Sequence, residues 1–282
     1  MATFSQRHGF KPVRSSLQLE DIDKDLRNGI WNVLTIYFWD RIDINDFDYN
    51  VLRQEDRLFF AGLWINHFKL PVDTMRYHWR TLLSDIRDRY FKCEWYEVYD
   101  FIEFAANNFS FEPARSKFII ACNSVLEKES SGYRFVNGQI TPITSEVEIS
   151  AIEQALSGGN FLKPVHQHLQ SALQKLSDKK NPDYRNSIKE SISAVEAICN
   201  LMTNKKGTLG DVLKKIKNLH PALRDSFIKL YGYTSDAQGI RHALLDEPTL
   251  EFEDAKFMLV SCSAFINYLV SMSGKSGIKL DS

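Results

Sequence analysis

Cysteine is scarce in this chain of 282 residues, and its cysteines are widely spaced. No two of them form a C-x-x-C pair, and no set of cysteines and histidines has the spacing of a zinc site. Two of them fall on apolar helical patterns, where a reduced thiol behaves as a small hydrophobic side chain. We therefore expect no metal site at Cys93, Cys122, Cys199 or Cys262, and we expect Cys199 and Cys262 to pack as reduced thiols.

Other signatures are also missing. The sequence has no glycine-rich phosphate loop, no H-E-x-x-H and no G-x-S-x-G. The formal net charge is −1, so an anion site has to come from a local patch of charge. No apolar run approaches the length of a membrane span, and the opening MATFSQRHGFKPVR has no apolar signal-type segment. These absences predict a cytoplasmic protein that does not bind a membrane.

Aromatic residues, in contrast, are abundant. They make up 12% of the chain, with five tryptophans and nineteen phenylalanines, which argues against disorder. The length allows one large domain or two ordinary ones. Apolar residues at helical spacing predict helices over 21–37 and at about 53–69, 72–90, 94–108 and 113–129. Residues 58–68 are apolar nearly all round, which predicts a helix in the middle of a bundle.

The period of the pattern changes near residues 133–143. Two short segments, 133–136 and 139–141, flank Asn137-Gly138, which is typical of a type I′ hairpin turn. Because an isolated two-stranded hairpin is at best marginally stable in water, we expect this hairpin to lie against the helices.

The second half of the chain has the most regular helical patterns. Ser145 and Glu148 resemble a capping box, and helices are predicted at about 160–177, 182–203 and 251–272. The last two helices each carry one apolar seam, the first formed by Ile188, Ile192, Val195, Cys199 and Met202, the second by Phe252, Ala255, Leu259, Cys262, Ile266 and Leu269. Complementary seams indicate an antiparallel helical bundle. The predicted fold is mainly α, with helical domains at 1–144 and 145–282 and one small hairpin.

Residues 230–247, LYGYTSDAQGIRHALLDE, hold most of the reactive side chains of this half. An adjacent arginine and histidine can neutralise a phosphate and move a proton near neutral pH. The candidate catalytic residues here are Tyr233, Ser235, Asp236, Arg241 and His242. A structural interpretation stays open, in which Asp236 caps a helix, Gly239 permits a close backbone contact and the charged side chains pair with one another.

A basic cluster lies just upstream, from residue 205 to residue 220. We interpret it as a shallow phosphate-binding patch with Lys205, Lys206, Lys214 and Lys215 as substrate-binding candidates. The alternative is a solvated helix surface whose buried face is formed by Leu209, Val212, Leu213 and Ile216.

Polar residues beside the helical seams complete the candidates. Glu190 and Glu196 lie near the seam of the 182–203 helix, where either could orient Arg241 or His242, or simply pair with a lysine. His166 and His168 would point roughly 200° apart on a helix, so they cannot close on one metal ion and are interpreted as surface residues.

Three stretches of the second half resemble a HEPN domain: SISAVEAIC (191–199), KGTLGDVL (206–213) and LYGYTSDAQGIRHA (230–243). The opening FSQRHGFKPVR (4–14), together with LRNGIWNVL (26–34), resembles the AbiJ amino-terminal domains that precede such HEPN modules in bacteria. The two similarities together cover nearly all of the chain.

The resemblance implies an abortive-infection factor acting in defence against phage. Many HEPN domains are metal-independent endoribonucleases that need no cofactor and commonly form homodimers. By this resemblance Arg241 would bind the phosphate of RNA and His242 would be the general acid or base, while the amino-terminal domain would sense a phage-derived trigger or bind a regulatory protein. The usual motif places four to six residues between arginine and histidine, whereas here Arg241 directly precedes His242.

Two other functions stay open from the sequence. One is a non-catalytic HEPN-like module that holds RNA, a nucleotide or a protein on the same basic patch. The other is a structural adaptor that oligomerises through its helical seams and has no affinity for RNA.

Overall fold

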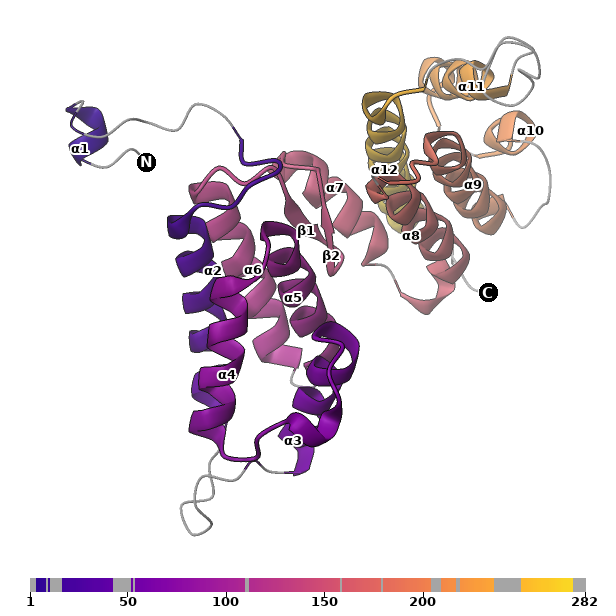
Figure 1. Cartoon of the computed structure of the whole chain (residues 1–282). Helices are drawn as coiled ribbons and strands as arrows, with labels where there is room; N and C mark the ends of the chain where they lie inside the picture. Colours follow the sequence, from indigo (N-terminus) through magenta and orange to yellow (C-terminus); the bar gives the residue numbers. More distant parts are fainter. Residues whose placement is uncertain are drawn as a thin grey trace. The chain divides into compact units, whose positions relative to one another are not determined.

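The computed structural model of the chain describes residues 4–8, 10, 17–42, 52, 54–109, 112–157, 159–178, 180–203, 209–216, 219–235 and 250–275. Internal contacts divide the chain into two compact units, Met1–Thr144 and Ser145–Ser282. We call these unit 1 and unit 2, and each is described by itself (Figure 1). Both are mainly helical, as the sequence predicts.

Unit 1 is built from helices and one hairpin. Its elements are α1 (Phe4–Arg7), α2 (Lys24–Tyr37), the 3₁₀ turn η1 (Trp39–Arg41), α3 (Gln54–Gly62), the π-helix η2 (Leu63–His67), the 3₁₀ turn η3 (Val72–Thr74), α4 (Trp79–Lys92), α5 (Trp95–Asn108), α6 (Glu112–Lys128), β1 (Arg134–Val136) and β2 (Gln139–Thr141).

Local capping explains where two of these helices begin. The Asp23 carboxylate accepts a hydrogen bond of 2.8 Å from the Leu26 N–H at the start of α2, and Glu94 forms a capping box with Glu97 at the start of α5. The predicted helix over 72–90 is wrong at its start, because after Pro71 the chain makes only the short turn η3 and α4 begins at Trp79.

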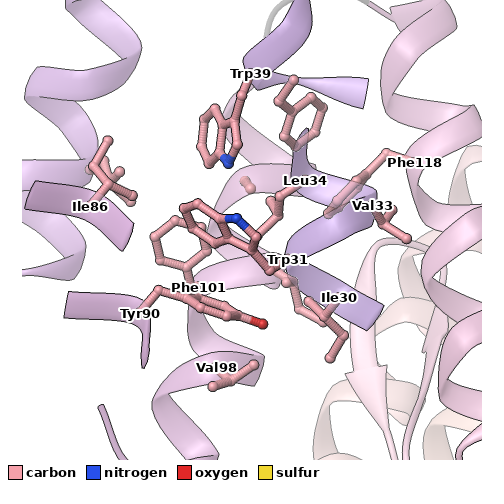
Figure 2. Close-up of a cluster of buried hydrophobic side chains, with 14 of the residues drawn as sticks. Ile30, Trp31, Val33, Leu34, Trp39, Ile86, Tyr90, Val98, Phe101 and Phe118 are labelled. Atoms are coloured by element: carbon pink, nitrogen blue, oxygen red, sulfur yellow. The ribbon is translucent and has the colours of Figure 1, made fainter. Parts of the chain in front are cut away.

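The core of unit 1 is a dense aromatic cluster (Figure 2). The ring of Trp31 on α2 lies 5.0 Å from that of Tyr90 on α4, and the ring of Phe38 stacks at 4.3 Å on that of Phe118 on α6. Aromatic side chains bury large areas and favour such tilted and offset arrangements. The abundance of aromatic residues in the sequence is therefore used largely to fill this one core.

The segment over residues 58–68 lies at the edge of this core rather than in its middle. Leu58 is 74% exposed and Ile65 is 50% exposed, whereas Phe60, Leu63 and Trp64 are buried. The prediction of a central helix was therefore wrong, because only one face of α3 and η2 is covered by other elements.

The hairpin prediction is confirmed. Asn137 and Gly138 have φ angles of 50° and 79°, as a type I′ turn requires, and β1 pairs antiparallel with β2. The hairpin is anchored on α5, where a Glu103 carboxylate oxygen accepts a hydrogen bond of 2.7 Å from the Ile140 N–H and the Asn107 amide donates one of 2.9 Å to the Gly138 carbonyl.

Unit 2 is a helical bundle with two peripheral helices. Its elements are α7 (Glu146–Leu156), the 3₁₀ turn η4 (Asn160–Leu162), α8 (Lys163–Ser177), α9 (Tyr184–Thr203), α10 (Leu209–Leu213), α11 (Pro221–Ser235) and α12 (Phe252–Lys275). α9 packs on α8 and α12, and α12 also packs on α7. All five seam residues of α9 are buried, and so are five of the six named for the last helix, the exception being Phe252.

By length and composition, α12 could cross a membrane between Phe252 and Ser273, so the expectation that no apolar run approaches that length does not hold. Half of its most apolar window is buried within the structure, where α12 contacts α7, α8 and α9. This burial is typical of the central helix of a bundle.

Candidate functional site

The predicted Arg–His site lies largely outside the described residues. Tyr233 and Ser235 belong to the end of α11, whose backbone is described although these two side chains are not. Asp236, Arg241 and His242 fall in the connection that joins α11 to α12, and residues 236–249 of that connection lie outside the described residues.

The structure describes only part of the basic cluster. Lys205 and Lys206 fall outside the described residues, while Lys214 and Lys215 follow α10 and are exposed to solvent. The Lys215 N–H donates a hydrogen bond of 2.9 Å to the Val212 carbonyl, which holds these two lysines in a turn. The apolar face of α10 is buried as expected and packs against α9 and α11, so both lysines belong to its solvent side.

Glu190 has a partner that the sequence did not indicate. Its carboxylate oxygen Oε2 lies 2.7 Å from Nδ1 of His168, and this contact joins α9 to α8. The side chain of His168 is 40% exposed and that of Glu190 is 29% exposed. The interpretation of His168 as a simple surface residue is corrected by this contact, because two antiparallel helices bring positions 168 and 190 together.

Glu196 and His166 are also half-buried on the α8–α9 pair. Burial raises the pKa of Cys199 to about 12, with a smaller contribution from the negative charge of Glu196, so this thiol stays protonated at neutral pH. His166 has a buried Nε2 atom without a hydrogen-bond partner among the described residues, and burial lowers its pKa. His166 is therefore a partly buried side chain that is neutral at physiological pH, rather than the surface residue that was predicted.

Unit 1 contains a pocket that the sequence did not reveal. It has a volume of about 520 Å³ and lies between η2, α4 and α5. Most of its lining residues have titratable side chains, namely His67, Asp85, Asp88, Arg89, Tyr90, Lys92, Cys93 and Glu97. Tyr90 and Phe101 belong both to this lining and to the aromatic core (Figure 2).

Two of the carboxylates in the pocket have cationic partners. Asp85 forms an ion pair with Arg76 at 3.2 Å, and Asp88 lies 3.9 Å from the ammonium of Lys92 one turn further along α4. The third carboxylate, Glu97, accepts a hydrogen bond of 2.8 Å from the Glu94 N–H.

Arg89 is held differently from these ion pairs. Its guanidinium lies over the rings of Trp64 and Phe68, at 5.5 Å from each ring centroid. Guanidinium groups bind to aromatic faces in this way and keep their N–H edge available. The structure shows no ion pair between Arg89 and a described carboxylate.

Burial tunes two further groups of the pocket. The pKa of His67 is lowered by burial, so the imidazole is neutral at physiological pH and can both donate and accept a hydrogen bond. Burial raises the pKa of Cys93, although the nearby charge of Arg27 acts in the opposite direction. The raised pKa keeps the thiol protonated. Among the described residues, no group of three or more histidine, cysteine or acidic side chains is placed to hold a metal ion.

The sequence signal for this pocket was weak. Asp85, Asp88, Arg89 and Lys92 recur at helical spacing, a pattern shared with any solvated helix face. The opposite wall comes from the π-turn η2, whose extra residue per turn shifts His67 away from its expected angular position. A periodic pattern predicts side-chain directions only for a regular helix, so the sequence does not show that these two walls lie together.

A helical unit with an aromatic core, a docked hairpin and a polar pocket is followed here by a separate helical bundle. The family model for AbiJ N-terminal domain 4 matches residues 2–158, more than half of the chain. The chain therefore belongs to the AbiJ N-terminal domain 4 family, which links it to abortive-infection defence. The match covers all of unit 1 from residue 2 and continues through α7. No curated protein and no solved structure matches the chain.

Proposed function

We propose that the protein is an abortive-infection effector whose unit 2 is a HEPN bundle that cleaves RNA without a metal ion. The proposal combines the family membership of the amino-terminal part with the three HEPN-like stretches of the second half. Unit 1 then receives the phage-derived trigger or a regulatory protein, and two copies of the chain face one another as a homodimer.

The observation that carries the proposal is the position of the Arg–His stretch in the order of elements. α11 ends at Ser235 and α12 begins at Phe252, so Arg241 and His242 lie in the connection between two helices of one compact unit. α10 packs against α11 and is followed by the exposed Lys214 and Lys215. The residues proposed to bind the phosphate and to transfer the proton therefore belong to one unit.

The chemistry requires only side chains and RNA. The 2′-oxygen attacks the adjacent phosphorus, a new O–P bond forms, and the bond from phosphorus to the 5′-oxygen breaks to leave a cyclic phosphate. His242 takes the proton of the 2′-hydroxyl or gives one to the departing 5′-oxygen, while Arg241 stabilises the extra negative charge on the phosphate. Tyr233, Ser235 and Asp236 orient these two groups.

The supporting roles fall to α9 and α10. Glu190, which is held by His168, and Glu196 act from α9 as positioning residues behind the reacting groups. Lys205, Lys206, Lys214 and Lys215 bind the RNA backbone, because phosphate contacts supply most of the affinity for nucleic acid without reading its sequence.

The test is an assay of the purified full chain against total cellular RNA in the presence of EDTA. Wild type is compared with Arg241→Ala and His242→Ala, and with Arg80→Ala, which removes an exposed arginine of unit 1 as a matched control. Cleavage that survives chelation, leaves cyclic-phosphate ends, persists in the control and disappears in both test variants supports the proposal.

Two results would overturn it. Cleavage and growth arrest that are unchanged in His242→Ala would exclude this histidine from the reaction. RNA that stays intact with wild type but binds tightly, and binds less after charge removal at Lys214 and Lys215, would instead identify a non-catalytic RNA-binding module.

A further inference from the structure

We propose that the pocket between η2, α4 and α5 binds a nucleoside phosphate, with its phosphate on Arg89 and its base against the aromatic wall. The volume of about 520 Å³ lies within the range of small-molecule sites, roughly 300–1,000 Å³. This inference depends on unit 1 alone and is independent of the ribonuclease proposed for unit 2.

The backbone around the pocket is irregular in the way that functional sites often are. η2 is a single π-helical stretch, and such turns recur at functional sites because they redirect a side chain. The chain leaves η2 through Lys69, which has a φ angle of 55°. The Leu70 N–H donates a hydrogen bond of 3.0 Å to the Trp64 carbonyl, so a hydrogen-bonded left-handed turn ends the helix directly after His67 and Phe68.

Arg89 is the anchor for the anion. The charge of Asp85 is compensated by Arg76 and that of Asp88 by Lys92, which leaves Arg89 as the cation whose described contacts are aromatic. A guanidinium already held over two rings loses little freedom on binding, and its planar fork matches a phosphate.

The apolar part of the pocket fits a flat ring system. Among the lining residues, Phe68 is half-buried and Phe101 is buried. The Phe101 ring lies 6.1 Å from that of Phe68 and 5.2 Å from the His67 ring, which stands at 83° to it. Every nucleobase offers a flat face to such aromatic walls. The neutral His67 adds one donor and one acceptor for the edge of the base.

Glu97 supplies the acceptor for hydroxyl groups. Its Oε2 atom accepts a hydrogen bond from the Glu94 N–H. A carboxylate has about four acceptor positions, so others remain for donors of a ligand. Ribose hydroxyls commonly bind to acidic side chains in this way. A simple phosphate would make no contact with the aromatic side chains, and a neutral aromatic molecule would leave Arg89 unused, so a nucleoside phosphate is the class that uses all three features.

The proposal is tested by isothermal titration of the full chain with AMP, GMP and UMP, with adenosine and inorganic phosphate as separate fragments. Arg89→Ala removes the phosphate anchor. Arg87→Ala is its matched control, because Arg87 is also exposed on α4 and also lies over an aromatic ring, that of Phe91, yet it does not line the pocket.

We expect at least one nucleotide to bind with saturation below about 1 mM, and Arg89→Ala to weaken it about tenfold. Arg87→Ala should leave the affinity unchanged, and each fragment should bind more weakly than the intact nucleotide. The proposal is overturned if no nucleotide gives saturable binding, if both arginine variants weaken binding equally, or if inorganic phosphate binds as tightly as the nucleotide.

Discussion

His168 on α8 and Glu190 on α9 are joined by a contact of 2.7 Å between Nδ1 and Oε2. The contact links the two helices at their outer edge, above a core of fully buried residues such as Leu169 and Ile188. It also gives Glu190, named from sequence as a residue that orients the reacting groups, a partner within the described structure.

The stability contributed by this contact should be small. Because both side chains are partly exposed, we expect a coupling energy of about 0.5 kcal/mol in a double-mutant cycle of His168→Ala and Glu190→Gln. The measurement is urea unfolding of the protein, monitored by far-UV circular dichroism. A coupling energy of zero would mean that the contact contributes nothing to stability.

Removal of charge at Lys214 and Lys215 should weaken binding of RNA. If both lysines contact phosphates, the double alanine variant reduces the slope of log affinity against log salt by about two, with little change in sequence preference. The matched control is Lys163→Ala with Lys180→Ala, which removes two exposed charges elsewhere in unit 2. Equal slopes for the two double variants would show that the lysines after α10 make no special contact with RNA.

Gly138→Ala should destabilise unit 1. Gly138 has a φ angle of 79°, and an added Cβ would lie 3.0 Å from the Asn107 side-chain oxygen, so we expect a loss of about 1–2 kcal/mol. Gly62→Ala is the control, because Gly62 has helical angles and its Cβ would make only ordinary contact with Phe104.

Tryptophan fluorescence during urea unfolding provides the readout, since all five tryptophans lie in unit 1. The control variant should be neutral or slightly more stable than wild type. A Gly138→Ala protein as stable as wild type would contradict the type I′ geometry of the turn.

Glu103→Gln should stabilise unit 1 at neutral pH. Burial raises the pKa of Glu103, against the opposing hydrogen bond from Ile140, so the folded unit holds this proton more tightly than the unfolded chain does. The contribution of Glu103 to stability therefore falls as the pH rises from its unfolded to its folded pKa, and stays low at neutral pH.

The glutamine keeps an acceptor for the Ile140 N–H but carries no charge, so its advantage should disappear in acid, where the glutamate is protonated. Urea midpoints at neutral and acidic pH test this, with the exposed Glu127→Gln as a control. A variant that is less stable than wild type at neutral pH would show that the charged hydrogen bond outweighs the cost of burial.

Thiol reactivity should separate Cys93 from the other three cysteines. Cys122, Cys199 and Cys262 are buried and have raised pKa values, about 12 for the last two, so the native protein offers almost no thiolate at these positions. Titration with a chromogenic disulfide should detect at most one slowly reacting thiol in the native protein and four after unfolding. Rapid reaction of two or more native thiols would contradict the burial of these side chains.

The fold could be predicted where a local signal decides the structure. Asn137 and Gly138 specify the hairpin by themselves, because both adopt positive φ angles at little cost. The buried face of α9 could be predicted because its seam residues recur at the spacing of a regular helix and therefore lie on one side of it. The start of α4 could not be predicted, because the segment after Pro71 has a helical composition but makes only a short turn.

The pocket and the His168–Glu190 contact could not be predicted, for a different reason. Each depends on the rotation of two elements about their axes and on which side chains then meet, as when η2 brings His67 to the Phe101 side of α5. A periodic pattern gives the buried face of one element but not its partner. The Arg241–His242 stretch was found by resemblance, and its role in catalysis stays a prediction.

None of the side chains described in α11 is buried, and it contacts α12 through the Phe227 ring, stacked at 3.5 Å on that of Phe265. α12, in contrast, buries Ala255 and Leu259 completely. Opening α11 exposes little apolar surface, so its amide hydrogens should exchange with solvent well before those of α12. In the sequence, Arg241 and His242 follow α11 and precede α12.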